Sequence, residues 1–170
     1  TLIGEVSQPG TYEMSSLSTL ANALYASGGP SNNGSFRKID LIRNGKRLVT
    51  FDLYDFLLNG DLTKNVLLKD DDIIKIHPYA VRLALTGAVK RPAIYESEPG
   101  ENLGTVIEKY ASGFADSANR NKITIQRFGE LGKSILNVDS KSINTFSLKS
   151  SDSVVVGAIP KRFENRVVIA

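Results

Sequence analysis

The sequence predicts an α+β fold built from two tandem copies of one small domain, each a mixed β-sheet around one main helix. The first observation is an internal repeat, in which four residues recur 83 positions later: Gly4, Val6, Pro9 and Tyr12. The second is the order of hydrophobic patterns in each copy, where strand-like alternation surrounds a single helical stripe. The third is an ordinary composition, with 41% hydrophobic and 23% charged residues, which argues against a disordered chain.

The repeat extends through the chain and sets the predicted domain boundaries. Tyr25-Ala26-Ser27-Gly28 recurs as Tyr110-Ala111-Ser112-Gly113 at an offset of 85. Arg43 recurs as Arg127 and Asp72 as Asp152, so the offset falls from 84 to 80 and predicts a shortened connection between Gly129 and Leu148. We therefore expect one domain at residues 1–80, a second at 81–161, and the start of a truncated third copy at 162–170.

The first copy opens with a predicted β-hairpin and a helix. Residues 2–6 and 11–14 alternate like strands around the turn residues Gln8-Pro9-Gly10. Ser16 or Ser18 is expected to cap the helix that follows. Its buried face is expected to carry residues at helical spacing: Leu17, Leu20, Ala21 and Leu24. Gly28-Gly29-Pro30 is a typical helix end.

The rest of the first copy reads as hairpin, short helix and closing strand. Asn44-Gly45 predicts a tight turn between strands at 39–43 and 48–51. A short helix is expected at 52–58, a turn at 67–72 and a strand at 73–76. The second copy repeats this order with a hairpin at 82–96, a helix at 102–112, a hairpin at 122–138 and a strand at 153–157. Strands that cup one helix in this order indicate a β-grasp, or ubiquitin-like, domain.

Composition removes several classes of site. The chain has no Cys, which excludes disulfides, thiol nucleophiles and Cys-ligated metals. His77 is the only His, so little is left for acid–base catalysis at neutral pH. The net charge of +3 does not indicate nucleic acid. There is no Gly-rich phosphate loop, and we expect no cofactor.

The first copy resembles the SLBB domain, the soluble-ligand-binding β-grasp family. The resemblance rests on an ordered set of short motifs: Gly4-Glu5-Val6, Pro9-Gly10-Thr11-Tyr12, Gly28-Gly29, Arg43-Asn44-Gly45, Asn59-Gly60-Asp61 and Asp70-Asp71-Asp72. The second copy departs from it, with Pro92-Ala93 for Pro-Gly, Gly113-Phe114 for Gly-Gly and Ser150-Ser151-Asp152 for the acidic turn. Tandem copies of this kind are similar to those of bacterial outer-membrane polysaccharide export proteins, the Wza-like group.

This resemblance implies a non-enzymatic periplasmic module of a capsule or exopolysaccharide export protein, at the periplasmic face of the outer membrane. It implies a homo-oligomeric ring or conduit, with the polysaccharide and an inner-membrane polysaccharide co-polymerase as partners. Membrane contact would come only through parts outside this chain. An alternative is a receptor for a glycan or another soluble ligand. A glycan-acting enzyme needs paired carboxylates facing a groove, and the acids here fall mostly in turns, so we expect no enzyme.

Four residues at equivalent positions are candidates for ligand binding: Tyr12, Arg43, Tyr95 and Arg127. Tyrosine rings pack on the C–H faces of sugars, and the arginine fork binds hydroxyls and carboxylates. The alternative is structural, with the tyrosines packed between hairpin and helix and the arginines bridging strands. Recurrence at equal positions favours this structural role.

The charged residues give one further candidate surface and one turn. Residues 1–80 carry eight basic and nine acidic side chains, and residues 81–170 carry 13 basic and nine acidic. An acidic polysaccharide or a neighbouring subunit could meet the local basic groups: Lys90, Arg91, Arg120 and Lys122. Asp70-Asp71-Asp72 lacks the spacing of a calcium loop, so we interpret it as a solvated turn rather than a metal site. His77 has no placed catalytic partner, and we expect it to make a surface or inter-repeat contact.

Overall fold

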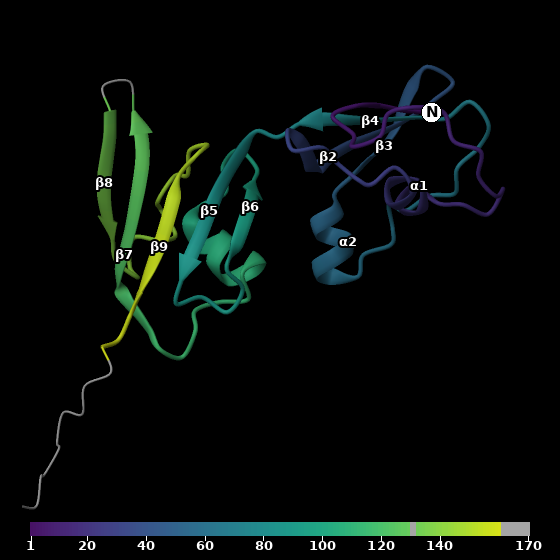
Figure 1. The fold of residues 1–170 in the computed structure, drawn as a ribbon. Coiled ribbons are helices and arrows are strands. Elements are labelled where there is room, and N and C mark those ends of the chain that lie inside the picture. The colour runs from purple at the N-terminus through teal and green to yellow at the C-terminus, as the bar shows by residue number, and fades with distance from the viewer. Residues whose placement is uncertain (130–131, 161–170) are drawn as a thin grey trace, which may run out of the picture. The chain divides into compact units, whose positions relative to one another are not determined.

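The computed structural model describes residues 1–129 and 132–160, so the predicted third copy at 162–170 lies outside the described residues. The chain folds into two compact units that divide between Val81 and Arg82. We refer to them as unit 1 and unit 2, and Figure 1 shows each with its own sheet. None of the helices in the described part of the chain is long and apolar enough to span a membrane.

Unit 1 is a four-stranded mixed sheet with a helix packed on one face. Its strands are β1 (Leu2–Gly4), β2 (Gly34–Arg43), β3 (Lys46–Phe51) and β4 (Ile73–Pro78), in the order β1-β4-β2-β3. β1 runs parallel to β4, and the other neighbours are antiparallel. Helix α1 (Leu20–Ala26) buries Leu20 and Leu24 in the core that Ile39, Leu41 and Ile74 form.

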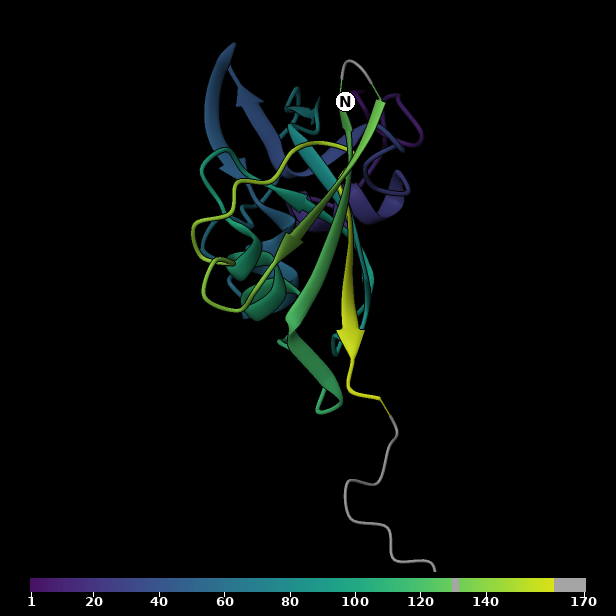
Figure 2. The ribbon, with the colours of Figure 1, turned by 90° about the vertical axis from the view of Figure 1, so that its left-hand side faces the viewer.

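Unit 2 repeats this plan with one strand more. Its strands are β5 (Val81–Gly87), β6 (Ala93–Ser97), β7 (Ala118–Gly129), β8 (Gly132–Val138) and β9 (Ser153–Ala158), in the order β6-β5-β9-β7-β8. β5 runs parallel to β9, as β1 does to β4. Figure 2 shows the long green β7–β8 pair beside the yellow β9. The predicted α+β class with two mixed sheets is confirmed.

The opening hairpin is present in unit 2 but not in unit 1. β6 pairs with β5, as predicted for residues 82–96. Residues 11–14 form no strand, so that part of the prediction is wrong. Leu2 exchanges its two backbone hydrogen bonds with Gly10, at 2.8 and 3.1 Å. The pairing goes no further than this one bridge.

Helix α1 begins later than the serines predict. Thr19 is the N-cap: its hydroxyl accepts from the backbone N–H of Asn22, and the Asn22 side chain accepts from the N–H of Thr19. This reciprocal capping box satisfies two N–H groups at the helix start at once. Leu17 therefore lies before the helix and is 77% exposed, so its predicted place on the buried face is wrong.

The second main helix contains one extra residue, which shifts the repeat. It consists of α3 (Leu103–Thr105) followed by the π-helical η1 (Val106–Tyr110). The N–H of Ser27 bonds to the carbonyl four residues back, whereas that of Ala111 bonds five residues back. A single inserted residue is accommodated in this way by a π-turn.

The insertion corrects the predicted correspondence of Tyr25 with Tyr110. The left-handed residues at the helix end are Gly28 and Gly29 in unit 1, and Ser112 and Gly113 in unit 2. The structural offset at this end is therefore 84 rather than 85. It also means that Ser112-Gly113, not Gly113-Phe114, replaces the Gly-Gly pair.

The connections after the second hairpin differ between the units. Unit 1 turns tightly at Asn44-Gly45, with φ of 53° and 71°, as predicted. It then forms helix α2 (Leu53–Asn59), which Asp52 caps and Gly60 ends. In unit 2, residues 139–147 are all described and contain turns but no helix. The predicted shortening lies there.

Candidate functional site

The recurring arginines each close a bidentate ion pair with an aspartate. Arg43 Nε and Nη2 donate to the Asp72 carboxylate at 2.8 and 2.7 Å, and Arg127 contacts Asp152 at the same two distances. Nη2 of each arginine also donates to a backbone carbonyl at 2.9 Å, that of Leu67 or Ser147. We call this arrangement the Arg–Asp clamp.

The clamp joins the end of one strand to the turn that leads into another. Asp72 also accepts the N–H of Lys69 at 2.8 Å, and Asp152 that of Lys149 at 2.9 Å. Asp71 and Ser151 take left-handed backbone conformations at equal places in the two turns. The turn of unit 2 has the same geometry, although Ser150 and Ser151 stand there in place of Asp70 and Asp71. Asp70 and Asp71 are therefore explained as residues of a turn. In the described residues no group of three or more metal-ligating side chains comes together.

The Arg–Asp clamp shifts the pKa values of its members in the directions expected for an ion pair. Hydrogen bonds from Arg43 hold the pKa of Asp72 below its usual value, although burial acts in the opposite direction. Hydrogen bonds to Asp152 raise the pKa of Arg127, again against the effect of burial. The hydrogen bonds to Asp72 likewise raise the pKa of Arg43, so both members of the clamp in unit 1 stay charged over the neutral range.

The recurring tyrosines each fasten the turn that precedes them. Tyr12 Oη donates to the carbonyl of Gln8 at 2.7 Å, and Tyr95 Oη donates to that of Arg91 at 2.5 Å. Tyr95 is buried, and burial raises the pKa of its hydroxyl, partly offset by the charge of Arg91. Tyr12 packs against the core of unit 1. These contacts match the structural alternative, and a role of the four residues in ligand binding stays a prediction.

Two basic residues of unit 2, Lys90 and Arg120, lie near Phe114. Val89 forms a β-bridge with Phe114, and the next residue, Lys90, donates its N–H to Gly113 at 3.0 Å. The Arg120 guanidinium lies 5.2 Å from the centre of the Phe114 ring. Lys90, Arg91, Arg120 and Lys122 are all exposed. Lys122 lies against β9, where a Cβ on Gly157 would come within 3.1 Å of its side chain. Phe114 was not predicted from the sequence, which indicated only the basic residues as a candidate surface.

His77 belongs to a polar group on the outer face of the unit 1 sheet. Its Nε2 lies 2.9 Å from Asp40 Oδ2, and Thr50 donates to Asp40 Oδ1 at 2.6 Å. Burial opposes ionisation of Asp40, but these hydrogen bonds outweigh it and lower the pKa of Asp40. His77 thus bridges β4 and β2 within one unit.

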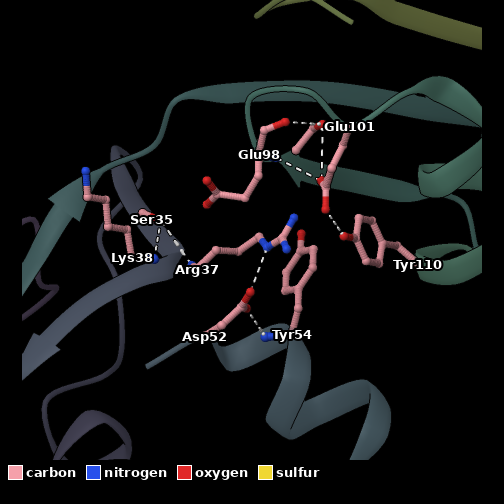
Figure 3. Close-up of polar contacts among 9 residues, drawn as sticks. Ser35, Arg37, Lys38, Asp52, Tyr54, Glu98, Glu101 and Tyr110 are labelled. Carbon is pink, nitrogen blue, oxygen red and sulfur yellow. Dashed lines mark hydrogen bonds and ion pairs between the residues drawn. The ribbon is translucent and has the colours of Figure 1, made fainter. Parts of the chain in front are cut away.

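Other acidic side chains also cap and connect elements. Asp52 accepts from the Tyr54 N–H at 2.8 Å and from Arg37 Nε at 3.0 Å, and Figure 3 shows the three residues together. In unit 2 the Glu101 carboxylate accepts from the Glu98 N–H at 2.9 Å and from the Tyr110 hydroxyl. Each of these acids is held in a structural contact of its own unit.

Two hollows lie on the surface of unit 1. The first, of about 360 Å³, has mainly hydroxyl and turn residues in its wall, among them Thr11, Tyr12, Ser15 and Asp71. The second, of about 520 Å³, lies between α1 and α2 and has no charged residue in its wall. We call it the α1–α2 groove.

Comparison with known families agrees with the repeat. A model described as the SLBB domain matches residues 1–76, and a second model with the same description matches residues 82–138. No curated protein matches the chain. The two matches follow one another along the chain, and each lies within one of the two units, so the chain belongs to the SLBB domain family and carries two SLBB domains in tandem.

Proposed function

We propose that this chain is a non-enzymatic periplasmic module of a bacterial polysaccharide export protein, where it helps to build a ring or conduit. SLBB domains are soluble-ligand-binding β-grasp modules that occur in such proteins. The observation that carries the proposal is the tandem pair of SLBB units in which both copies spend the same Arg, Asp and Tyr on internal contacts. This use of the recurring polar side chains supports a role in assembly or binding rather than in catalysis.

The partners follow from the same proposal. Copies of this protein associate in a ring at the periplasmic face of the outer membrane, and capsular or extracellular polysaccharide passes through it. An inner-membrane polysaccharide co-polymerase is the expected partner on the opposite side of the periplasm.

The experiment is to isolate the complete gene product from envelope membranes in detergent and measure its mass. A closed oligomer, together with loss of surface polysaccharide in a deletion strain, supports the proposal. A monomer, or a deletion strain with normal surface polysaccharide, contradicts it. Fractionation of the periplasm and the two membranes checks the location.

A second candidate function is binding of an acidic glycan by the basic surface around Phe114. Lys90 follows Val89, which bridges to Phe114, and the Arg120 guanidinium lies near the Phe114 ring. Both basic residues are exposed, which suits contact with carboxylates on a sugar chain. Titration with an acidic oligosaccharide should saturate, and Arg120→Ala should weaken it severalfold, while Lys64→Ala in unit 1 should not. Equal loss with the two variants, or no saturation, removes this candidate.

A further inference from the structure

The two units differ where unit 1 has an additional helix. Helix α2 follows β3 and precedes β4 along the chain, while the corresponding residues 139–147 of unit 2 form turns and no helix. Together with α1 it encloses the α1–α2 groove, which is lined by Ala21, Asn22, Leu24, Tyr25, Gly28, Gly29, Pro30, Phe36, Leu53, Phe56 and Leu57. Tyr25 is 91% exposed and Leu57 63% exposed. Unit 1 therefore has a concave, solvent-exposed surface that is mainly apolar and carries no charged side chain.

Unit 2 differs in the opposite sense, because its second hairpin is longer. In unit 1 the hairpin turns directly after the Arg43–Lys46 pair. In unit 2 the rungs Phe128–Lys133 and Gly129–Gly132 continue beyond the corresponding Arg127–Ser134 pair. In Figure 1, β7 and β8 form the outer pair of the sheet.

The longer hairpin carries exposed apolar side chains on one face. Phe128 pairs with Lys133, and Ile135 pairs with Gln126, so Phe128 and Ile135 are diagonal neighbours on one face. The core residues Ile123 and Ile125 point to the other face. Phe128 is 62% exposed and Ile135 68%, and the Lys133 ammonium lies 4.9 Å from the Phe128 ring centre. We call Phe128, Lys133 and Ile135 the β7–β8 ridge.

We propose that the α1–α2 groove of one copy binds the β7–β8 ridge of a second copy. An uncharged groove favours an apolar occupant over a charged glycan, and adjoining exposed apolar residues mark protein interfaces. Residues 1–80 carry one more acidic than basic side chain and residues 81–170 four more basic than acidic, so unlike charges favour unit 1 of one copy meeting unit 2 of the next.

This inference rests on the proposed function and says how its ring is joined. The groove and the ridge are different surfaces, so the contact is heterologous. A heterologous contact repeats from copy to copy, and it closes a ring when the rotation between copies allows it.

Disulfide trapping tests the contact, and the absence of native Cys makes the chain suited to it. One preparation carries Leu57→Cys and an affinity tag, and an untagged one carries Ile135→Cys. Mixing and mild oxidation should give a cross-linked pair that contains both. The matched control replaces Leu57→Cys by Leu48→Cys, at a 51% exposed leucine of β3 outside the groove. We expect at least about tenfold less cross-linking there.

The outcomes separate this inference from the proposed function. In the complete gene product, Phe128→Ser with Ile135→Ser should weaken ring assembly at least about tenfold, with an unchanged circular dichroism spectrum. If the native protein forms rings but the double variant assembles equally well, or Leu48→Cys cross-links as well as Leu57→Cys, the groove contact is wrong and the proposed function stands. A native protein that stays monomeric overturns both. Protection of Leu57→Cys from a thiol reagent by an oligosaccharide, but not by a second copy, assigns the groove to a glycan and overturns the inference.

Discussion

Asp152 shows how much structure a single carboxylate organises in this fold. It is buried and receives three hydrogen bonds, two from Arg127 and one from the N–H of Lys149. Because a buried charge is costly without its partner, the two residues depend on each other. The side chain connects β7 to the turn before β9 and thereby sets the register of the closing strand.

Asp152→Ala should destabilise the protein by about 3 kcal/mol, since it leaves the Arg127 guanidinium with neither carboxylate oxygen. The measurement is the urea midpoint, followed by circular dichroism. Asp116→Ala, at an exposed position of the same unit, is the control and should change stability by less than about 0.5 kcal/mol. Equal midpoints for the two variants would show that the clamp is dispensable.

The lowered pKa of Asp72 leads us to expect that the stability of the protein depends on pH. Its pKa is lowered in the folded state, so the stability it contributes is present above the ordinary Asp value and is lost as pH falls through the lowered one. The lowered pKa of Asp40 acts in the same direction. The urea midpoint should therefore fall below about pH 5, and more steeply in the native protein than in Asp72→Asn. A midpoint independent of pH between about 5 and 2 would contradict this expectation.

At the scale of the element, a tight backbone turn explains the glycine that opens each repeat. Val6 donates its N–H to the carbonyl of Gly4, and Val89 does the same to Gly87, both at 2.9 Å. The two glycines have φ of 82° and 86°. A Cβ would lie 2.3 Å from the carbonyl oxygen of Ile76 in unit 1, and 2.1 Å from that of Val156 in unit 2. The turn thus requires glycine for its angle and for the space beside the parallel strand.

Gly87→Ala should destabilise unit 2 by about 3 kcal/mol or more, because left-handed strain adds to the clash with Val156. Gly100→Ala separates the two causes, since Gly100 has φ of 93° but no atom within 4 Å of a Cβ. It should cost only about 1 kcal/mol. Thermal melting of both variants measures the difference, and equal losses would mean that the close approach to β9 has no energetic weight.

The main helices show how the same element tolerates a change of length. Unit 2 places one more residue between its helix start and its left-handed end than unit 1, and a π-turn absorbs it. The consequence is a different fate for two tyrosines: Tyr25 is exposed at the groove, and Tyr110 is buried with its hydroxyl on Glu101. Matching letters in the sequence therefore did not mean matching positions.

At the scale of the whole molecule, each unit has its own sheet and its own helix-covered core. We expect residues 1–81 to fold when expressed alone, since their core residues all come from that segment. The test is a two-dimensional NMR spectrum together with a urea transition. Dispersed amide signals and one cooperative transition are expected. A collapsed spectrum without a transition would show that unit 1 needs the rest of the chain.

Much of the fold could be predicted because it depends on local chemistry. The Asn44-Gly45 turn, the short helix that Gly60 ends and the closing strands follow from turn residues and alternating hydrophobic side chains. The errors occurred where a neighbour in space decided the outcome. Thr19, rather than Ser16 or Ser18, caps α1 because Asn22 completes a reciprocal pair of hydrogen bonds with it. Residues 11–14 form no strand because the backbone pairing stops at the bridge between Leu2 and Gly10.

The sequence by itself determined the tandem repeat, the α+β class and the family, because these depend on the order of short motifs along the chain. It also marked Arg43, Arg127, Asp72 and Asp152 as recurring residues. Only the tertiary structure decided that they bind one another, since the members of each pair lie 25 or 29 positions apart. The same holds for the α1–α2 groove and the β7–β8 ridge. Each depends on side chains that distant segments bring together, and a linear pattern does not specify such contacts.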